Sequence, residues 1–370
     1  MKFIIKQIYF IDALRILSGT TEKSANNNFS ANVFFNLTNK HLLMKTCDGE
    51  IELTIKIVNI NIIKIGTLST NFDKLYNICK NFDKQELLTI ELKIQNVYIK
   101  TINSEYMLST FNSSLFPVYK KEILDIKFTI GRIFLKNMIN KISFSMSSQD
   151  IRSFLNGMLF DFNEKKLTLV STDGYRLSKV DFDININHEI NKKIILPRKS
   201  VIEMHKILSL CKDEQAIFFF SMNYIEIIID NVKFRTKLLA GIYPNYNNFI
   251  PKNNNKFLVI NNIKLRKTIM RMSVLCNIKS NKILFTCSKN ILKLKTLNFH
   301  QDKGKEKLDI DYLGNEIKIC FNIKYFIDIL YKIESSLLEI SFYDGISSAV
   351  LKEVQKEKYN LIYIIMPVKI

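Results

Sequence analysis

The sequence has 370 residues and a formal net charge of +19 at pH 7, and 47% of its residues are hydrophobic. This length and composition predict two or three folded domains and exclude a chain that is disordered over most of its length. The charge favours an anionic partner, most simply nucleic acid, although an AT-biased genome rich in lysine, asparagine and isoleucine codons would also raise it.

The N-terminal segment, MKFIIKQIYFIDALRIL, begins like a signal peptide. Lys6, Asp12 and Arg15 interrupt its apolar run, and no small-residue cleavage site follows. Apolar runs elsewhere, such as AIFFF and LIYIIMPV, are far shorter than a membrane span. We therefore expect a soluble, cytoplasmic protein with no membrane partner.

Six windows along the chain combine apolar residues at helical spacing with basic residues, at 6–17, 71–80, 132–142, 198–208, 263–273 and 322–333. Their starts lie about 60 to 66 residues apart. Strand-like segments lie between them, including LTIELKI, VYIKTI, AIFFFSM, YIEIIID, ILKLKTL and LLEISFY. A unit of one helix and several strands therefore occurs six times. Pairs of units predict three α+β domains, over residues 1–125, 126–250 and 251–370.

Positive charge is concentrated in the six helical windows. They hold 16 lysines and arginines against four acidic residues, whereas the whole chain has 54 against 35. Compositional drift alone does not explain this imbalance. A helix with one apolar face on a sheet and one basic face outward suits contact with a phosphate backbone.

The stretch STDGYRLSKV at 171–180 contains a hairpin signal, because glycine readily adopts the positive φ of a tight turn. Tyr175, Arg176 and Leu177 follow Asp173-Gly174 directly. An aromatic, a cation and an aliphatic side chain at one turn indicate either a corner between two strands or part of a binding site.

Motifs for catalysis and for cofactor binding are absent from the sequence. No phosphate-binding glycine loop, nucleophile elbow or zinc-protease helix occurs. The six cysteines contain no C-x-x-C pair and the four histidines fit no metal spacing, which indicates reduced core thiols. The carboxylate pairs Asp181/Asp183 and Asp309/Asp311 are interpreted as solvated strand ends. We expect no catalytic residue, no metal and no cofactor.

Several motifs, in order, resemble the DNA polymerase III β subunit family of bacterial sliding clamps. They are MKF, LST with FP at 108–117, IRSFLNGMLF, STDGYRLS, LPRKSVIEMHKIL, GIYPNYNNFIPKN, FNIKYFIDIL and IMPVKI. The resemblance covers the whole chain. It implies three similarly folded α+β clamp domains per protomer, and two protomers joined head to tail as a ring around duplex DNA. It also implies a non-enzymatic processivity factor.

The resemblance implies that basic helices line the ring and contact DNA weakly and without sequence preference, since the ring must slide. The DNA-binding positions that it implies are Lys23, Lys74, Lys80, Lys136, Gln149, Arg152, Phe154, Arg198, Lys199 and Lys206. Residue 153 is serine, where the family often has an aromatic side chain, so base stacking is not expected there. A charge of +19 is unusual for a family whose members are usually acidic.

The resemblance also implies a hydrophobic pocket that captures short peptides of the polymerase III catalytic subunit and the clamp loader. Tyr175 and Asn248 depart from the histidine and arginine that are common in the family, which affects the peptide preference. The matching positions are Leu155, Thr172, Gly174, Tyr175, Arg176, Leu177, Pro244, Asn248, Phe249, Asn322, Tyr325, Ile346, Ser348, Ile365, Met366, Pro367, Val368 and Ile370.

The dimer interface implied by the family joins the first domain of one protomer to the third domain of the other. Tyr106, Val274 and Leu275 are its apolar candidates. Two other readings stay open: a basic repeat protein that binds nucleic acid without forming a ring, and an enzyme whose site the sequence does not reveal.

Overall fold

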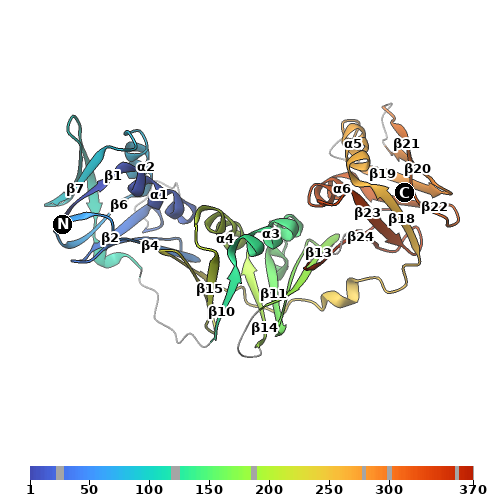
Figure 1. Ribbon diagram of the computed structural model, residues 1–370, viewed down its shortest axis with the longest axis horizontal. Coiled ribbons are helices and arrows are strands. Elements are labelled where there is room, and N and C mark those ends of the chain that lie inside the picture. The colour runs from blue at the N-terminus through green and yellow to red at the C-terminus, as the bar shows by residue number, and fades with distance from the viewer. Residues whose placement is uncertain are drawn as a thin grey trace. The chain divides into compact units, whose positions relative to one another are not determined.

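The computed structural model describes residues 1–21, 29–117, 126–184, 190–276, 281–297, 302–354 and 358–369. Within these residues the chain divides into two compact units, shown in Figure 1. Unit 1 comprises residues 1–136 and 202–238, and unit 2 comprises residues 137–201 and 239–370. Each unit is described by itself below.

All six helices predicted from the sequence are present. Asparagine begins three of them: the side chains of Asn71, Asn261 and Asn322 accept hydrogen bonds from backbone N–H groups of the first turn, as N-caps do. The α-helices are α1 (Gln7–Leu17), α2 (Phe72–Cys79), α3 (Arg132–Ile142), α4 (Arg198–Leu210), α5 (Asn262–Ser273) and α6 (Ile323–Leu330).

Unit 1 contains one antiparallel sheet of 13 strands, which runs in the order β10-β15-β16-β17-β4-β3-β2-β6-β9-β8-β7-β1-β5. Buried aromatic side chains join α1 to this sheet, since Phe10 contacts Phe3 and Phe35. The strands are β1 (Lys2–Lys6), β2 (Asn32–Leu37), β3 (Leu42–Cys47), β4 (Ile51–Ile57), β5 (Asn61–Lys64), β6 (Gly66–Asn71), β7 (Leu87–Lys93), β8 (Asn96–Lys100), β9 (Glu105–Phe111), β10 (Ile126–Gly131), β15 (Gln215–Phe220), β16 (Tyr224–Ile229) and β17 (Val232–Lys237).

Unit 2 contains an eight-stranded sheet in the order β14-β11-β12-β13-β25-β24-β23-β18 and a four-stranded sheet in the order β21-β20-β19-β22. Phe326 of α6 packs against Phe285 and Phe321 of the smaller sheet. The strands are β11 (Gly157–Glu164), β12 (Lys166–Thr172), β13 (Arg176–Asp183), β14 (Ile190–Pro197), β18 (Lys256–Asn261), β19 (Lys282–Ser288), β20 (Ile291–Thr296), β21 (Lys305–Asp309), β22 (Ile317–Asn322), β23 (Leu337–Phe342), β24 (Ala349–Glu353) and β25 (Asn360–Ile365).

The same hairpin turn occurs in both units of the described chain. Gly49 has φ +90° and Gly174 has φ +89°. In each turn the preceding aspartate carboxylate accepts two backbone N–H bonds from the residues that follow the glycine. The strand after the first turn, β4, pairs antiparallel with β17. The strand after the second turn, β13, pairs antiparallel with β25. The two units therefore repeat the same strand junction.

No helix in the described part of the chain is long and apolar enough to cross a membrane. The same residues contain no group of three or more histidine, cysteine, aspartate or glutamate side chains that could hold a metal ion. All six cysteines lie in described residues and none forms a disulfide.

Candidate peptide-binding site

A pocket of about 520 Å³ lies in unit 2 beside the turn at Asp173-Gly174. Apolar side chains make up most of its wall, and a few hydroxyl, amide and guanidinium groups reach into it, a composition typical of ligand sites. The lining residues are Arg152, Phe154, Leu155, Thr172, Gly174, Tyr175, Arg176, Leu177, Pro244, Asn248, Phe249, Pro251, Ile346, Ser347, Ser348, Ile364 and Met366.

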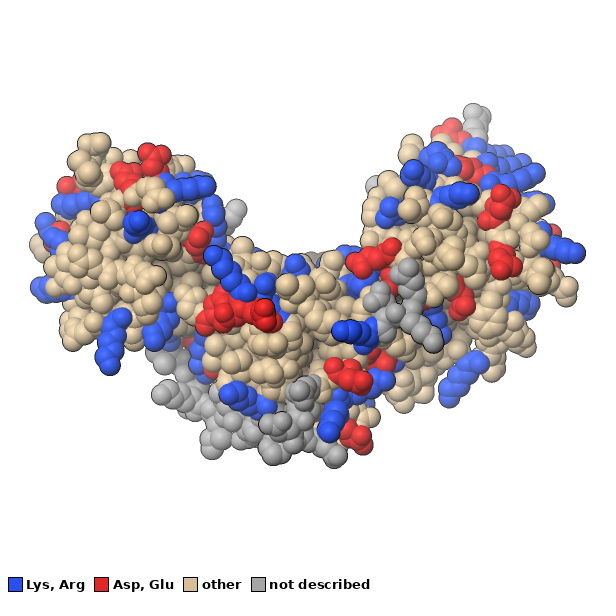
Figure 2. All heavy atoms as spheres, in the orientation of Figure 1, with Lys and Arg blue, Asp and Glu red and all other residues tan. Residues whose placement is uncertain are grey.

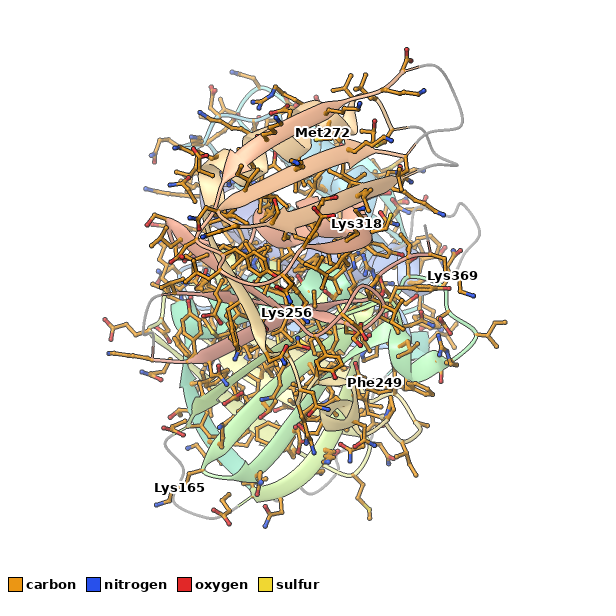
Figure 3. All side chains as sticks on the ribbon, turned by 90° about the vertical axis from the view of Figure 1, so that its right-hand side faces the viewer. Lys165, Phe249, Lys256, Met272, Lys318 and Lys369 are labelled. Carbon is orange, nitrogen blue, oxygen red and sulfur yellow. The ribbon has the colours of Figure 1, made fainter. Side chains whose placement is uncertain are left out.

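Most of the residues predicted for peptide binding meet in this pocket. They come from three separate stretches of sequence, around residues 155–177, 244–249 and 346–366, and Figure 3 labels Phe249 in unit 2. The predicted residues that line the pocket are Leu155, Thr172, Gly174, Tyr175, Arg176, Leu177, Pro244, Asn248, Phe249, Ile346, Ser348 and Met366.

The floor of the pocket is a buried apolar cluster. Leu177, Val350 and Ile364 belong to it, and Phe154 packs against it from the side. Ile365 was predicted for the pocket, but Ile364 lines it instead. Successive side chains of a strand point to opposite faces of the sheet, so the two residues at the end of β25 cannot both face the pocket. Ile365 is fully buried on the other face.

The turn is held by a dense set of hydrogen bonds. Asp173 Oδ1 accepts the backbone N–H groups of Tyr175 and Arg176, each at 3.0 Å. Thr172 Oγ1 accepts the N–H of Gly174 at 3.0 Å and donates to the carbonyl of Arg176 at 2.6 Å. The positive φ of Gly174 completes the turn, so the pocket wall is fixed by local interactions.

Arg176 connects this turn to α6. Its Nε lies 2.9 Å from Asp173 Oδ2, and its Nη1 lies 2.5 Å from Asp328 Oδ2. The guanidinium is 4.5 Å from the ring centroid of Tyr325 and 5.1 Å from that of Phe144. Such stacking of a planar cation on aromatic rings is favourable. Arg176 therefore supports the wall with its charge already neutralised.

Tyr325 and Asn322 were predicted for the pocket but are not among its lining residues. Tyr325 stacks on Tyr175, with ring centroids 6.4 Å apart, so it supports the exposed Tyr175 ring from behind. The Asn322 side chain accepts the N–H of Lys324 and caps α6. These two residues hold neighbouring elements in place.

The C-terminal segment runs beside the turn and along the four-stranded sheet. The Met366 N–H donates to the Tyr175 carbonyl at 2.9 Å, and the Val368 N–H donates to the Cys320 carbonyl at 2.8 Å. Met366 lines the pocket, whereas Pro367 and Val368 do not. Ile370 lies outside the described residues.

Arg152 and Phe154 were predicted as DNA contacts, and the structure places both on the pocket wall. The Arg152 guanidinium donates two hydrogen bonds to the Asp150 carboxylate, at 2.9 and 3.0 Å, and the Arg152 backbone N–H donates a third at 2.8 Å. The bonds from Arg152 lower the pKa of Asp150 to about 2. Gln149 next to them is exposed.

The other predicted DNA contacts differ in their exposure and in the partners of their side chains. Lys74, Lys80 and Lys199 are exposed and Lys136 is half-buried. The Arg198 Nη1 donates to the Met146 carbonyl at 2.7 Å. Lys206 lies 3.0 Å from Ser18 Oγ and 3.4 Å from Glu203 Oε2. Lys23 lies outside the described residues.

The predicted interface residues lie in separate units, Tyr106 on β9 of unit 1 and Val274 and Leu275 just after α5 of unit 2. Tyr106 is on β9, is 44% exposed and packs edge-on against Phe82 in unit 1. Val274, just after α5 in unit 2, is 82% exposed, and Leu275 beside it is half-buried. In unit 2 the edge strand β21 pairs with β20 alone.

Family models for the N-terminal, central and C-terminal domains of the DNA polymerase III beta subunit match residues 1–120, 129–245 and 247–369. The beta sliding clamp of Buchnera aphidicola subsp. Rhopalosiphum padi is 31% identical over 373 residues, covering 100% of both chains. The chain belongs to the bacterial β sliding clamp family. The beta sliding clamp of Pseudomonas aeruginosa is 28% identical, with the same full coverage.

Solved clamp structures have the same fold. The crystal structure of the DNA polymerase III subunit beta from Pseudomonas aeruginosa has a TM-score of 0.95 at 27% identity and covers 100% of both chains. A second structure of that clamp, bound to griselimycin, has a TM-score of 0.95 at 28% identity, also with 100% coverage of both chains. The predicted family and α+β clamp fold are confirmed.

Family membership establishes the function at the level of the whole protein. It is a DNA sliding clamp, the non-catalytic processivity factor of DNA replication that works with DNA polymerase III. The predicted function is therefore confirmed.

Five lining residues were not predicted for the pocket: Arg152, Phe154, Pro251, Ser347 and Ile364. Ile364 could have been predicted from strand alternation. Met366 was predicted for the pocket, and residues two apart along a strand point to the same face, so residue 364 of β25 should face the pocket too. Pro251 and Ser347 lie outside helices and strands, where no sequence periodicity predicts which way a side chain points.

Proposed function

We propose that the pocket beside Asp173-Gly174 captures short linear peptides of the DNA polymerase III catalytic subunit and the clamp loader. The observation that carries this is the convergence of Tyr175, Phe249, Ile346 and Met366 on one apolar cavity. Its few polar groups would orient a bound chain, and its apolar wall would receive aliphatic and aromatic side chains.

We further propose that two copies form a head-to-tail ring of six clamp domains, with boundaries near residues 125 and 250. The internal repeat supports this. In the first two repeats, β4 pairs with β17 and β13 pairs with β25. The strand at the same place in the third repeat is β21, which lies at the edge of its sheet and pairs with β20 alone in the described part of the chain. β9 occupies the place in the first repeat that β17 and β25 occupy in theirs, and its last two residues, Thr110 and Phe111, pair with β6. In the described part of the chain its residues 105–109 pair with β8 alone, and Tyr106 and Met107 among them are exposed. The repeat therefore favours pairing of β21 with β9 of a second copy.

DNA threaded through this ring would contact the basic helices through phosphates alone, which allows sliding. The charge of +19 would then tighten the contact and slow diffusion. Diffusion of the loaded ring on DNA should accelerate as salt rises, and a salt-independent rate would contradict this. The cytoplasm is the compartment in which a bacterial replication clamp would act.

The pocket is tested with a labelled peptide from the C-terminus of the polymerase catalytic subunit. Its binding to the native chain is compared with binding to a chain that lacks MPVKI, residues 366–370. We expect the deletion to weaken binding at least tenfold, since it removes Met366 and the segment bonded to Tyr175 and Cys320. Ile94→Ala, at a side chain that is 98% exposed, is the control. Equal binding by all three proteins would contradict the assignment.

The ring is tested by light scattering. A ring requires a dimer, whereas a repeat protein that binds nucleic acid without a ring has the mass of one chain. A loaded ring should also remain on circular DNA and leave the ends of linear DNA.

A further inference from the structure

Six lysines lie on one face of the four-stranded sheet in unit 2. Along β20 the exposed Lys293 and Lys295 alternate with buried leucines, and along β21 the exposed Lys305 and Lys307 flank the half-buried Glu306. Figure 3 looks onto this sheet, with Lys318 labelled, and Figure 2 shows blue side chains gathered at the upper right, over β20 and β21. We call this set the lysine face: Lys282, Lys293, Lys295, Lys305, Lys307 and Lys318.

The strand register places these charges directly opposite one another. Lys293 pairs with Lys307, and Lys295 pairs with Lys305. Like charges directly opposite across two strands destabilise a sheet. The lysine face therefore concentrates repulsion at four adjacent positions.

Nearby carboxylates do not relieve this repulsion. Glu306 lies between Lys305 and Lys307 in sequence, but it pairs with Arg271 of α5, with oxygens 2.5 and 2.9 Å from the guanidinium. Within the described residues, none of the four central lysines forms an ion pair. The exposed Lys318 lies 3.4 Å from Glu316 at the edge of the face. The centre of the lysine face thus keeps its charge.

The lysine face is separate from the helices of the same domain. Phe285 and Phe321 point from the other side of the sheet and pack on Phe326 of α6. Because alternate residues of a strand face opposite sides, α6 and the lysines lie on opposite sides of this sheet. A ligand on the lysine face therefore cannot be the DNA that contacts the helices at the same point.

The chemistry of the face indicates the kind of ligand. The other residues on this side of the sheet include no aromatic ring, so bases have no stacking platform. They are Leu284, Thr286, Ser288, Ile291, Asp309, Cys320 and Asn322. Only Ile291 is an exposed large apolar side chain, at 38%, and protein interfaces depend on buried aromatic or apolar anchors and contain few lysines. The face suits a regular polyanion bound through charge.

We propose that the lysine face binds the phosphate backbone of duplex DNA, as a second contact distinct from the basic helices. Strands lie about 4.8 Å apart and alternate residues about 6.7 Å apart along a strand, so the four ammonium groups reach several neighbouring phosphates. The contact reads no sequence, and its strength falls steeply with salt.

The test uses covalently closed circular duplex DNA without a clamp loader, so that a closed ring cannot thread the probe. The variant K293Q/K295Q/K305Q/K307Q is compared with K56Q/K64Q/K84Q/K252Q, which removes the same charge from exposed lysines elsewhere. We expect the first variant to bind at least tenfold more weakly. The slope of log affinity against log salt should fall by about 0.9 for each phosphate that the variant no longer neutralises. The second variant should change the slope by less than the value for a single phosphate.

Three results of the binding experiment would overturn the proposal. Equal weakening in both variants would show that net charge alone binds the DNA, and unchanged binding in both would exclude the face. Displacement of DNA by poly-glutamate at equal charge concentration would assign the face to an acidic protein.

Folding and assembly are checked on the same samples. Without DNA the first variant should melt no lower than the native chain, because two like-charge pairs are removed. Its mass by light scattering should match that of the native chain. A loss of dimer in this variant alone would assign the lysines to the subunit interface and overturn the proposal.

Discussion

Arg176 Nη1 and Asp328 Oδ2 are 2.5 Å apart and connect the turn of the peptide pocket to helix α6, 152 residues along the chain. The Arg176 side chain is 10% exposed and that of Asp328 is 45% exposed. The ion pair therefore holds the turn at residues 173–176, which forms one wall of the pocket, against α6. Asp173 binds the same guanidinium.

Replacing Asp328 with asparagine should lower the affinity of the pocket for the polymerase peptide about threefold to tenfold. The arginine keeps Asp173, so the free energy of unfolding should fall by only about 1 kcal/mol. Peptide titration and chemical denaturation measure the two effects. The control is Asp12→Asn, which removes an exposed carboxylate paired with Arg15 in unit 1. The same drop in affinity in both variants would contradict the positioning role of Asp328.

Gly174→Ala should destabilise the protein by about 1 kcal/mol, because an L-residue with φ near +89° is strained. Gly49→Ala imposes the same strain at φ +90° in the repeated turn. Both variants should lose similar stability in denaturation, but only Gly174→Ala should weaken peptide binding. Weaker peptide binding in the Gly49 variant would show that the effect is global.

Lys141→Met should lower the free energy of unfolding by about 3–5 kcal/mol, because it leaves the buried carboxylate of Glu353 without its cation. The Lys141 Nζ lies 3.6 Å from Glu353 Oε1 and 3.1 Å from the exposed Glu334. The double variant Lys141→Met/Glu353→Met should recover most of the loss. Equal destabilisation in the single and double variants would show that the pair contributes packing instead of charge.

The same lysine has a defined pH dependence. Burial lowers the pKa of Lys141, but Glu334 and Glu353 outweigh burial and raise it. A raised lysine pKa adds stability at pH values below the ordinary lysine pKa, and this stability is lost as the pH rises through the folded value. Denaturation midpoints of the native chain should fall more steeply above pH 10 than those of Lys141→Met. Parallel profiles would contradict this.

Asp150 should titrate at about 2 in the native protein, because Arg152 donates hydrogen bonds to its carboxylate. In Arg152→Gln its pKa should rise toward the ordinary aspartate value of about 3.9. The depressed pKa contributes stability at pH values above the ordinary value, and that contribution is lost as the pH falls toward 2. Carboxyl NMR shifts followed from pH 6 to pH 1.5 measure both values. An unchanged pKa in the variant would exclude the Arg152 side chain as the cause.

The repeating pattern and the local geometry follow from the amino-acid sequence alone. All six helices lie where apolar spacing predicted them, and the turn at Asp173-Gly174 forms as its residues require, since both depend on neighbours within a few positions. Motif order along the whole chain was enough to recognise the family.

Which side chains meet depends on the tertiary structure. Ile364 lines the pocket and Ile365 does not, because the register of β25 against β13 sets which face each occupies. Arg152 and Phe154 join the pocket wall, and Asp328 reaches Arg176 across 152 residues. The opposed pairs of the lysine face likewise depend on the pairing of β20 with β21. Contacts between residues far apart in sequence follow from strand register and packing. A periodicity of two or 3.6 residues shows which face of a strand or helix is apolar, but it does not show which distant segment packs against that face.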